Sequence, residues 1–528
     1  MKFAALYAAL LLIAPSAFSA AVVQPPRNPF LADSNYSMGH ANSAQTDSTV
    51  DPGPVGPTRQ LRDDEMRYQD LGMFNLAYVI SSPYKDGKRV VWTNGSQFMT
   101  KLDHDTFDIV ATLRLPGEDH ADVLTHERLL TALDAKSSFD EKWAVVQKSG
   151  YPPISGVYTL LDKDNQYVVA GKGFIRVYGD STPGDRLSGI VVKGQWDQPK
   201  DVTGEFIGMN MTFDGRIVLA TSDGYVIALS RDFNDVKTIR LPGAEQEVPK
   251  QPKGLGWLRN SFAIDENGGI YIPSQHILHK VVWNGSKLST SEQDGAWNEP
   301  FRNSLERGSG STPTLVGFGN EPDKLVVITD GDKLMNVTAY WRDDIPSDWK
   351  QLPDAPSRRI AGLRPANFGD PKLTAAQSEQ SVVTSGYGMV VVNNEPRNVP
   401  TSIIDDRLSK KMFIGYLAYL KEYQPRGVQK FEWNPKTRTL NPAWVNNDAS
   451  DINGVPFVST GSGTVYMMGA RDDQWTLEGV DWATGASKFH YVLGGARFNS
   501  FYSQPVIDAE GRVMVSALYG ALRLQPKP

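Results

Sequence analysis

Glu379 is the residue of this sequence whose type and surroundings point most clearly to chemistry. It lies between Ser378 and Gln380, with Ser381 next, at the start of an apolar, β-branched run. Carboxylate and amide oxygens are ligands that Ca²⁺ accepts, and a carboxylate in a polar setting can also act as a general base. The pattern predicts either a calcium-dependent hydrolytic site with Glu379 as its catalytic residue, or polar residues that only form hydrogen bonds at the start of a strand and have no catalytic role. Both interpretations stay open.

Other catalytic classes find less support in the residues. The chain contains no cysteine, which excludes disulfides, thiolate zinc sites, a cysteine nucleophile and a lipid-modified cysteine. The run 307–313 contains Gly-Ser-Gly but continues into Ser-Thr-Pro, so it does not match the strand-to-helix elbow of a serine hydrolase. The same run precedes a strand instead of opening a helix, so it is not a nucleotide-binding loop.

The elements that must position such residues are short strands that repeat one sequence pattern. Residues 211–229, 261–273 and 505–516 each show an apolar strand, a polar tip with Gly or Asn, and a second β-branched strand. Two Asp-Gly pairs within 211–229 have the chemistry of tight hairpin turns. About eight such units follow one another at intervals of roughly 50–70 residues. Two segments, 120–133 and 403–423, have helical spacing and are predicted as insertions between strands.

These units predict an all-β fold, a single β-propeller with eight blades favoured over seven. A radial arrangement of the units covers both faces of each four-stranded sheet. The alternative is two stacked β-sandwiches, but the strands of sandwiches seldom repeat one sequence pattern so often. The innermost strands of a propeller converge on its central channel, and residues at or just before their starts face the axis. The candidates for ligand binding there, beside Glu379, are Asn210, Ser311, Thr312, Gln380 and Gln504.

The run 463–469, followed by 479–485, resembles the repeat of the PQQ-like (quinoprotein-type) β-propellers, and residues 38–54 resemble the lead-in of many members. This resemblance implies that an early segment near 58–72 completes the sheet formed by 505–524. The dehydrogenases of that group hold a calcium-bound PQQ with acidic and amide ligands and an adjacent cysteine pair. This chain cannot supply the cysteines, so calcium is a cofactor these residues could hold, and PQQ is not expected.

The N-terminal part predicts export. Lys2, the apolar run 3–14 and the small–x–small sequence Ala17-Phe18-Ser19 form a secretory signal over residues 1–20. Residues 21–57 are rich in Ser, Asn, Asp, Gly and Pro and are predicted as an extended arm, and 58–528 form the propeller. We therefore expect a periplasmic or secreted protein.

The charge of the chain limits its partners. Its formal net charge of −6, without charged blocks, argues against nucleic acid and against a polybasic membrane patch. Past the signal, no apolar stretch reaches the ~18 residues of a membrane span. We expect a monomer that binds a protein partner or a small-molecule ligand at the channel.

The function that this sequence favours is an exported, soluble binding or assembly module, without enzymatic activity. Two alternatives from another class stay open. The first is a calcium-dependent hydrolase or lactonase with its site in the central channel, and the second, less favoured, is a PQQ-dependent oxidoreductase. Fold alone does not decide between them, because propellers host enzymes and scaffolds alike.

Overall fold

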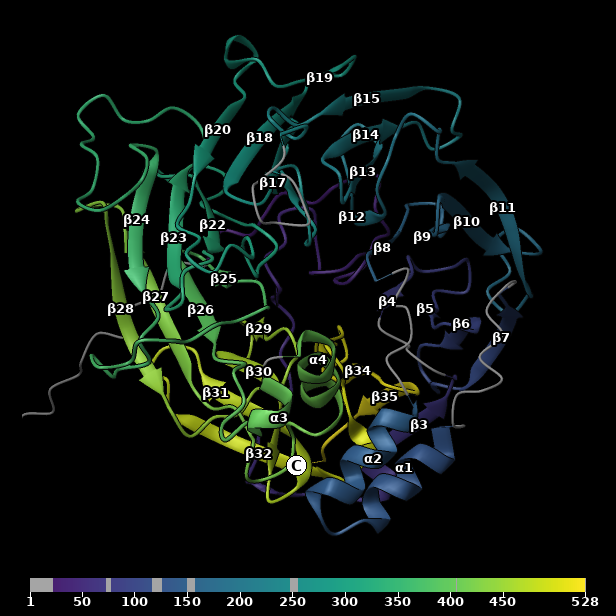
Figure 1. The fold of residues 1–528 in the computed structure, drawn as a ribbon. Helices are drawn as coiled ribbons and strands as arrows, with labels where there is room; N and C mark the ends of the chain where they lie inside the picture. The colour runs from purple at the N-terminus through teal and green to yellow at the C-terminus, as the bar shows by residue number, and fades with distance from the viewer. Residues whose placement is uncertain are drawn as a thin grey trace, which may run out of the picture.

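The computed structural model describes residues 22–72, 77–115, 126–149, 157–246, 255–404 and 406–527, without the side chains of residues 126–128. The described residues form eight antiparallel sheets, arranged in a ring around a central axis (Figure 1). The predicted all-β propeller is confirmed. The predicted signal at residues 1–20 lies outside the described residues.

Apart from the strands contributed by residues 48–70, the strands of each sheet follow one another from the axis outward in chain order. Most first strands contact the first strand of a neighbouring sheet. The first strands are β4 (Ala77–Ile80), β8 (Thr159–Leu161), β12 (Phe206–Met211), β16 (Ala263–Ile264), β21 (Thr314–Val316), β25 (Val383–Ser385), β29 (Phe457–Ser459) and β33 (Val506–Ile507). The second strands are β5 (Val90–Asn94), β9 (Tyr167–Gly171), β13 (Ile217–Thr221), β17 (Gly269–Pro273), β22 (Leu325–Thr329), β26 (Gly388–Val392), β30 (Thr464–Arg471) and β34 (Val513–Ala517). The third strands are β6 (Phe98–Asp103), β10 (Phe174–Asp180), β14 (Tyr225–Leu229), β18 (Ile277–Trp283), β23 (Asn336–Trp341), β27 (Val428–Asn434), β31 (Gln474–Asp481) and β35 (Gly520–Leu524). The outer strands are β7 (Ile109–Arg114), β11 (Ile190–Asp197), β15 (Val236–Arg240), β19 (Leu288–Ser289) with β20 (Trp297–Pro300), β24 (Ile360–Pro365), β28 (Thr439–Asn446), β32 (Ser487–Gly494) and β3 (Met66–Asp70).

The Asp-Gly turns predicted within 211–229 join β12 to β13 and β13 to β14. Gly215 and Gly224 have φ of +90° and +82°, values that favour glycine over residues with a Cβ. A Cβ at position 215 would also lie 2.5 Å from a ring carbon of Phe30. Local turn chemistry and a contact with the N-terminal arm therefore both require glycine there.

The ring is closed by strands from the two ends of the chain. β3 pairs antiparallel with β35 and supplies the outer strand of the sheet that also contains β33 and β34. This confirms the pairing of an early segment near 58–72 with the strands of 505–524. Two short strands, β1 (Ser48–Thr49) and β2 (Arg59–Gln60), add parallel edges to the sheet of β29–β32.

Helices are few in the described part of the chain, and residues 120–125 of the predicted segment 120–133 lie outside it. The helices are α1 (His126–Ala135), α2 (Phe139–Ser149), α3 (Thr401–Ile404) and α4 (Arg407–Tyr416), with the 3-10 turns η1 (Asp63–Glu65), η2 (Glu292–Asp294) and η3 (Ala496–Phe498). The prediction of one helix over 403–423 was wrong, because α4 ends at Tyr416 and the chain then continues in turns. The helix α2 was missed. None of the helices in the described part of the chain combines the length and apolar composition that crossing a membrane requires.

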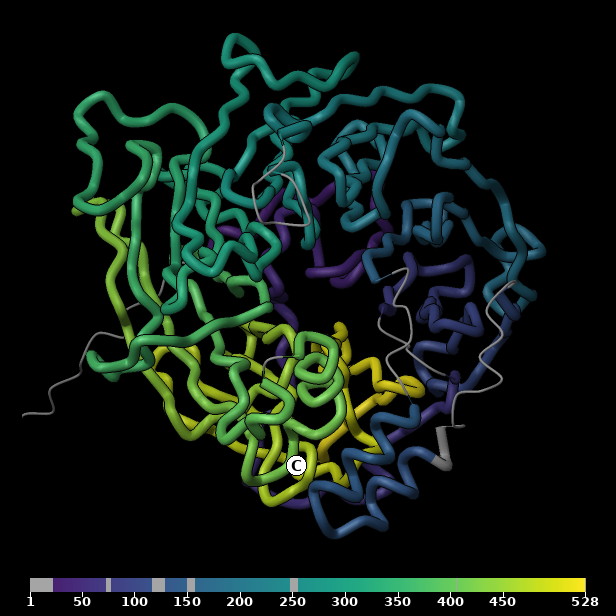
Figure 2. The backbone as a smooth tube through the Cα atoms, in the orientation of Figure 1, coloured from purple at the N-terminus to yellow at the C-terminus, as the bar shows by residue number. Residues whose placement is uncertain are grey.

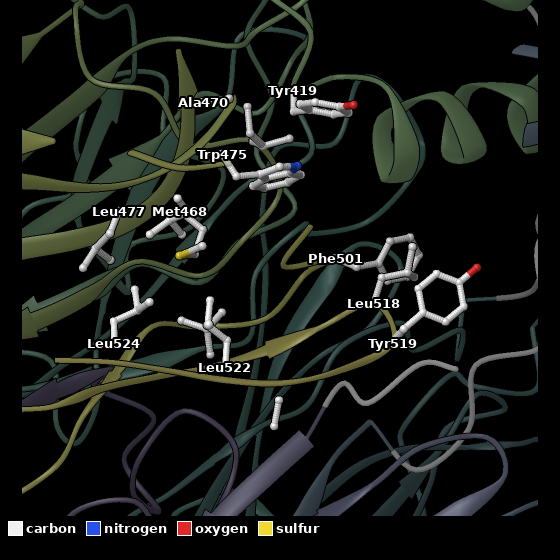
Figure 3. Packing of buried hydrophobic residues seen from close by; sticks show 14 of the residues in the cluster. Tyr419, Met468, Ala470, Trp475, Leu477, Phe501, Leu518, Tyr519, Leu522 and Leu524 are labelled. Carbon is white, nitrogen blue, oxygen red and sulfur yellow. The ribbon is translucent and has the colours of Figure 1, made fainter. Parts of the chain in front are cut away.

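The largest hydrophobic cluster joins these helices to the sheets that contain β30, β31, β34 and β35. Trp475 of β31 stacks on Tyr419, with ring centroids 5.6 Å apart (Figure 3). Both side chains are buried. The helical insertion is therefore anchored on the propeller face by aromatic packing, and this fixes where α4 lies.

The N-terminal arm runs through the middle of the ring (Figure 2). An edge strand presents N–H groups without a neighbouring strand, and the arm supplies acceptors for those that face the axis. It hydrogen-bonds at or beside the first strand of every sheet: Ile80 N to Tyr36 O, Leu161 N to Ser37 O, Asn210 Nδ2 and Ile264 N to Ser43 O, Leu315 N to Ala44 O, Thr384 N to Thr46 O, Val458 N to Asp47 O, and Asn35 Nδ2 to Ile507 O. The arm thus closes the channel across its width.

Candidate functional site

A cavity of about 410 Å³ lies in the channel, on one side of the arm. Tyr36, Gly39 and His40 of the arm contribute to its floor. Its walls come mainly from residues that precede or begin the first strands, together with Arg407 and Lys411 of α4. A separate cavity of about 450 Å³ is lined by the arm together with Ile80 and Ala509, which end or follow first strands. The arm therefore separates two chambers. The first, which we name the central cavity, holds most of the predicted site residues.

The walls of the central cavity are rich in cationic groups. Arg259, Arg407 and Lys411 line it, and the same three residues line a smaller adjoining cavity of about 150 Å³. Arg307 and Lys410 line only the adjoining cavity. Neither the Arg307 nor the Arg407 guanidinium makes a hydrogen bond or ion pair with another described residue. Cations without protein partners in a concave site favour the binding of anions.

α4 places three of these cations. Its N-cap residue Asp406 accepts a hydrogen bond from Ser409 N at 2.8 Å, so the helix begins at Arg407. The N-terminal end of a helix carries a partial positive charge, and cations in its first turns lower helix stability by a few tenths of a kcal/mol each. α4 nonetheless carries Arg407, Lys410 and Lys411 in that part. The helix dipole and its side chains together give the cavity a positive potential.

Glu379 lies within this cationic group. Its Oε1 accepts a hydrogen bond from the Arg259 guanidinium at 2.6 Å, and half of its side chain is exposed. Burial by itself raises the pKa of Glu379, but Arg259, Lys411 and Arg407 lower it, and the net result is a pKa below the ordinary value. The carboxylate is therefore ionised at neutral pH and engaged by an arginine. A strongly ionised carboxylate of this kind accepts protons poorly.

A histidine–aspartate pair lies at the floor. His40 Nδ1 is 3.0 Å from Asp47 Oδ1 and 3.1 Å from Oδ2. Asp47 is fully buried and also accepts a hydrogen bond from Gln504 Nε2 at 2.7 Å. Gln504 Oε1 in turn accepts from the Tyr36 hydroxyl at 3.0 Å. Burial and the charge of Asp47 raise the pKa of Tyr36, which keeps its hydroxyl protonated.

The structure brings four of the six predicted residues together. Thr312, Glu379, Gln380 and Gln504 line the central cavity. Asn210 and Ser311 do not. The Asn210 amide is fully buried and donates to Ser43 O and Phe262 O, and the Ser311 hydroxyl accepts from Thr329 N at 2.8 Å. Both tie backbone segments together. The catalytic role of Glu379 remains a prediction.

Sequence reasoning missed the cationic residues and the floor. Arg259 precedes β16, so the rule that picked Glu379 could have found it. His40 and its partner Asp47 were not among the predicted site residues. Because the arm has no strand or helix period, nothing in the sequence indicated that residues 40 and 47 meet in the channel.

Calcium, which the fold family implies together with PQQ, does not fit the central cavity. Glu205 and Glu379 are its carboxylates among the described residues, and Glu379 is engaged by Arg259. A dication would lie beside Arg259, Arg407 and Lys411, where its repulsion is unfavourable. The cysteine pair that covers the quinone in the dehydrogenases is also excluded by composition.

A second cluster has metal-ligand residue types. Ligand atoms of His104, Asp508 and Glu510 lie within 4.8 Å of one another. The Arg512 guanidinium, however, donates to Asp508 Oδ2 at 2.6 Å and to Glu510 Oε2 at 3.0 Å. Burial and the charges of Arg512, Arg89 and Arg523 lower the pKa of His104 to about 3. An arginine already occupies the place of a cation, so this cluster is an ion-pair network.

Comparison with known proteins finds a relative for the whole chain. No model of a protein family matches. A protein of Archaeoglobus fulgidus, named "Uncharacterized protein", is 31% identical over 523 residues, which cover 97% of this chain and 90% of the relative. Among solved structures, a quinohemoprotein alcohol dehydrogenase from Pseudomonas putida aligns with a TM-score of 0.51 and 13% identity over 94% of this chain and 82% of that one. Its counterpart from Comamonas testosteroni aligns with a TM-score of 0.51 and 11% identity over 94% and 78%. The resemblance to PQQ-like propellers is thus confirmed at the level of the fold.

Proposed function

This chain belongs to the same protein family as the Archaeoglobus fulgidus protein. Because this relationship assigns no activity, we propose a function from the site itself: the protein binds a small anionic ligand in the central cavity. The observation that carries this proposal is the gathering of Arg259, Arg407 and Lys411 around one concave site beside the N-terminus of α4. Its volume of about 410 Å³ lies within the range of small-molecule sites.

The binding function is favoured over the calcium-dependent hydrolase. In that alternative Glu379 would hold the metal or take a proton, but its carboxylate is paired with Arg259 and its pKa is lowered. In a binding site the same carboxylate has a clear role, because it orients the guanidinium and tempers the positive charge of the site. Among the described residues of the cavity, no comparable feature favours an assembly role with a protein partner, because the cationic groups suit a small anion.

We also propose that the protein is exported and acts in the periplasm or outside the cell. The signal-like sequence of residues 1–20 supports this proposal. Fractionation of cells that express the full chain, with mass spectrometry of the N-terminus, tests it. A mature protein that begins near residue 21 in the exported fraction is expected, and an intact N-terminus in the cytoplasmic fraction would contradict it.

The binding proposal predicts that Arg407→Glu weakens anion binding roughly ten-fold or more, because it reverses a charge in the cavity wall. Arg407 is exposed and its side chain makes no hydrogen bond or ion pair with another described residue, so folding should be unaffected. Calorimetric titration with inorganic phosphate and with dicarboxylates from succinate to pimelate measures the effect.

Lys200→Glu is the matched control. Lys200 is exposed, has no ion partner among the described residues and does not line the central cavity, yet the substitution changes the net charge by the same amount. The control should bind these anions as the unaltered protein does. Equal weakening in both variants, or no binding of any of these anions by the unaltered protein, would show that the central cavity is not an anion site.

A further inference from the structure

His40 is a polar residue at the floor of the central cavity. Asp47 takes Nδ1 of His40, at 3.0 and 3.1 Å, so Nε2 is the ring nitrogen left for a molecule in the cavity. Nε2 makes no hydrogen bond to another described residue. Asp47 Oδ1 also accepts from Gln504 Nε2, so we assign the carboxylate as the acceptor and Nδ1 as the donor of this pair. Nε2 is therefore an acceptor when the imidazole is neutral and a donor when it is charged.

The surrounding network holds this histidine in position. Asp47 is anchored by Gln504 Nε2, Gln504 by the Tyr36 hydroxyl, and the imidazole stacks on Tyr158 with ring centroids 6.1 Å apart. The backbone adds a further constraint, since His40 and Asp47 have φ of +62° and +55°. Left-handed backbone at residues other than glycine costs of order 1–3 kcal/mol each and persists where the surroundings enforce it. The hydrogen bonds from the arm to every sheet provide that enforcement.

We infer that His40 is a second anion-binding subsite at the floor of the central cavity. The ligand is then a dianion, with one oxyanion at the wall formed by Arg259, Arg407 and Lys411 and the other on protonated His40. Binding of this ligand is accompanied by the uptake of a proton. This inference rests on the proposed anion-binding function and narrows its ligand class. It follows from the placement of an Asp-oriented imidazole and a cationic wall on the same cavity.

The charges around His40 explain the proton uptake. Asp47 and Tyr36 face it from the arm and Tyr158 from the segment before β8, while Glu205, Glu379 and the three wall cations line the same cavity. A dianion neutralises the wall cations and adds an acceptor beside Nε2. Protonation of His40 then becomes more favourable, and a proton is taken up together with the ligand.

Calorimetry in two buffers with different ionisation enthalpies tests the inference, because the difference in apparent heat gives the number of protons taken up per ligand. The probes are succinate, glutarate, adipate and pimelate, each compared with a monocarboxylate of equal chain length. We expect the best-fitting dicarboxylate to bind with uptake of up to about one proton near neutral pH, and its affinity to rise as the pH falls from 8 to 6. Glu379 stays ionised over this range, because its pKa is lowered, and does not contribute.

His40→Asn is the informative variant. Asparagine tolerates the left-handed backbone, and its Nδ2 can replace Nδ1 as the donor to Asp47, but it has no titrating second nitrogen. This variant should lose the proton uptake and bind dicarboxylates roughly ten-fold more weakly, with monocarboxylate binding unchanged. His276→Asn, a histidine that does not line the central cavity, is the control and should retain the uptake.

The outcomes separate this inference from the proposed function. Dicarboxylate binding that depends on Arg407 but shows no proton uptake, or equal uptake in His40→Asn, overturns the inference and leaves the proposed function standing. Monocarboxylates that bind as tightly as every dicarboxylate overturn the assignment of a dianionic ligand. If His40→Asn does not fold, the comparison of mono- and dicarboxylates on the unaltered protein still decides.

Discussion

Replacing Trp475 with alanine is expected to lower the free energy of unfolding by about 3–5 kcal/mol. The indole is 1% exposed, stacks on Tyr419 and belongs to the cluster that joins the helices to the propeller (Figure 3). Its removal leaves a cavity between two elements that cannot collapse independently, so both the transfer energy and the packing are lost. The midpoint of urea denaturation, followed by tryptophan fluorescence and circular dichroism, measures the effect.

Trp475→Phe distinguishes the contribution of side-chain size to stability from that of the indole N–H group. The Trp475 Nε1 atom has no hydrogen-bond partner among the described residues, so phenylalanine removes no hydrogen bond. We expect this variant to lose much less stability than the alanine variant, about 1 kcal/mol. An equal loss in both variants would show that the cluster does not carry the stability assigned to it.

Replacing Glu65 with glutamine is expected to lower the free energy of unfolding at pH 7 by about 2 kcal/mol. The Glu65 carboxylate is buried and accepts from both terminal nitrogens of Arg59, at 2.6 and 2.7 Å. It also accepts from Arg62 N at 2.9 Å and Lys527 N at 2.6 Å. Glu65 thus joins the segment before β3 to the C-terminal end at the point where the ring closes, and glutamine cannot serve all four donors.

The pH dependence of this effect has a definite sign. Hydrogen bonds from Arg59 lower the pKa of Glu65 in the folded protein, so the folded state holds the carboxylate ionised more strongly than the unfolded state does. The stabilisation is fully present above the unfolded value of about 4.3 and is lost as the pH falls below it. The difference in stability between Glu65→Gln and the unaltered protein should therefore be constant from pH 6 to 8 and shrink below about pH 4.5.

Asp64→Asn is the control for this prediction. Asp64 is the neighbouring residue, pairs with Arg62 and Lys527, and is exposed. Because water screens exposed pairs, its loss should change the urea midpoint little at any pH. A larger effect from Asp64→Asn than from Glu65→Gln would contradict the assignment of Glu65 as the residue that secures the closure.

Much of the fold could be predicted from short-range patterns. The two Asp-Gly turns were identified because glycine alone accepts their backbone conformation readily, and the neighbouring strands were identified by their β-branched runs. The helix that was expected over 403–423 was misplaced at its end, since apolar spacing there continues into turns that pack on Trp475. Packing between distant elements overrode the local period.

The site could be predicted only in part. Glu379, Gln380 and Thr312 line the central cavity, and their position before a first strand is a local property of the sequence. Asn210 and Ser311 obey the same rule, yet their side chains bond to backbone, since the arm and the neighbouring strands leave polar atoms that need partners. Position along a strand indicates the axis, but the contents of the channel decide which side chains reach the cavity.

The sequence by itself determined the class of fold, the lack of cysteine chemistry and which residues lie at the starts of the first strands, near the axis. These properties depend on composition and on residues close together in the chain. Only the tertiary structure decided that the arm closes the channel, that His40 and Gln504 both hydrogen-bond to Asp47, and that α4 brings Arg407 and Lys411 to the same cavity as Arg259. These contacts join segments that are far apart in the chain or carry no regular period. Their energies depend on burial, backbone geometry and charge in three dimensions, which no local pattern of residues records.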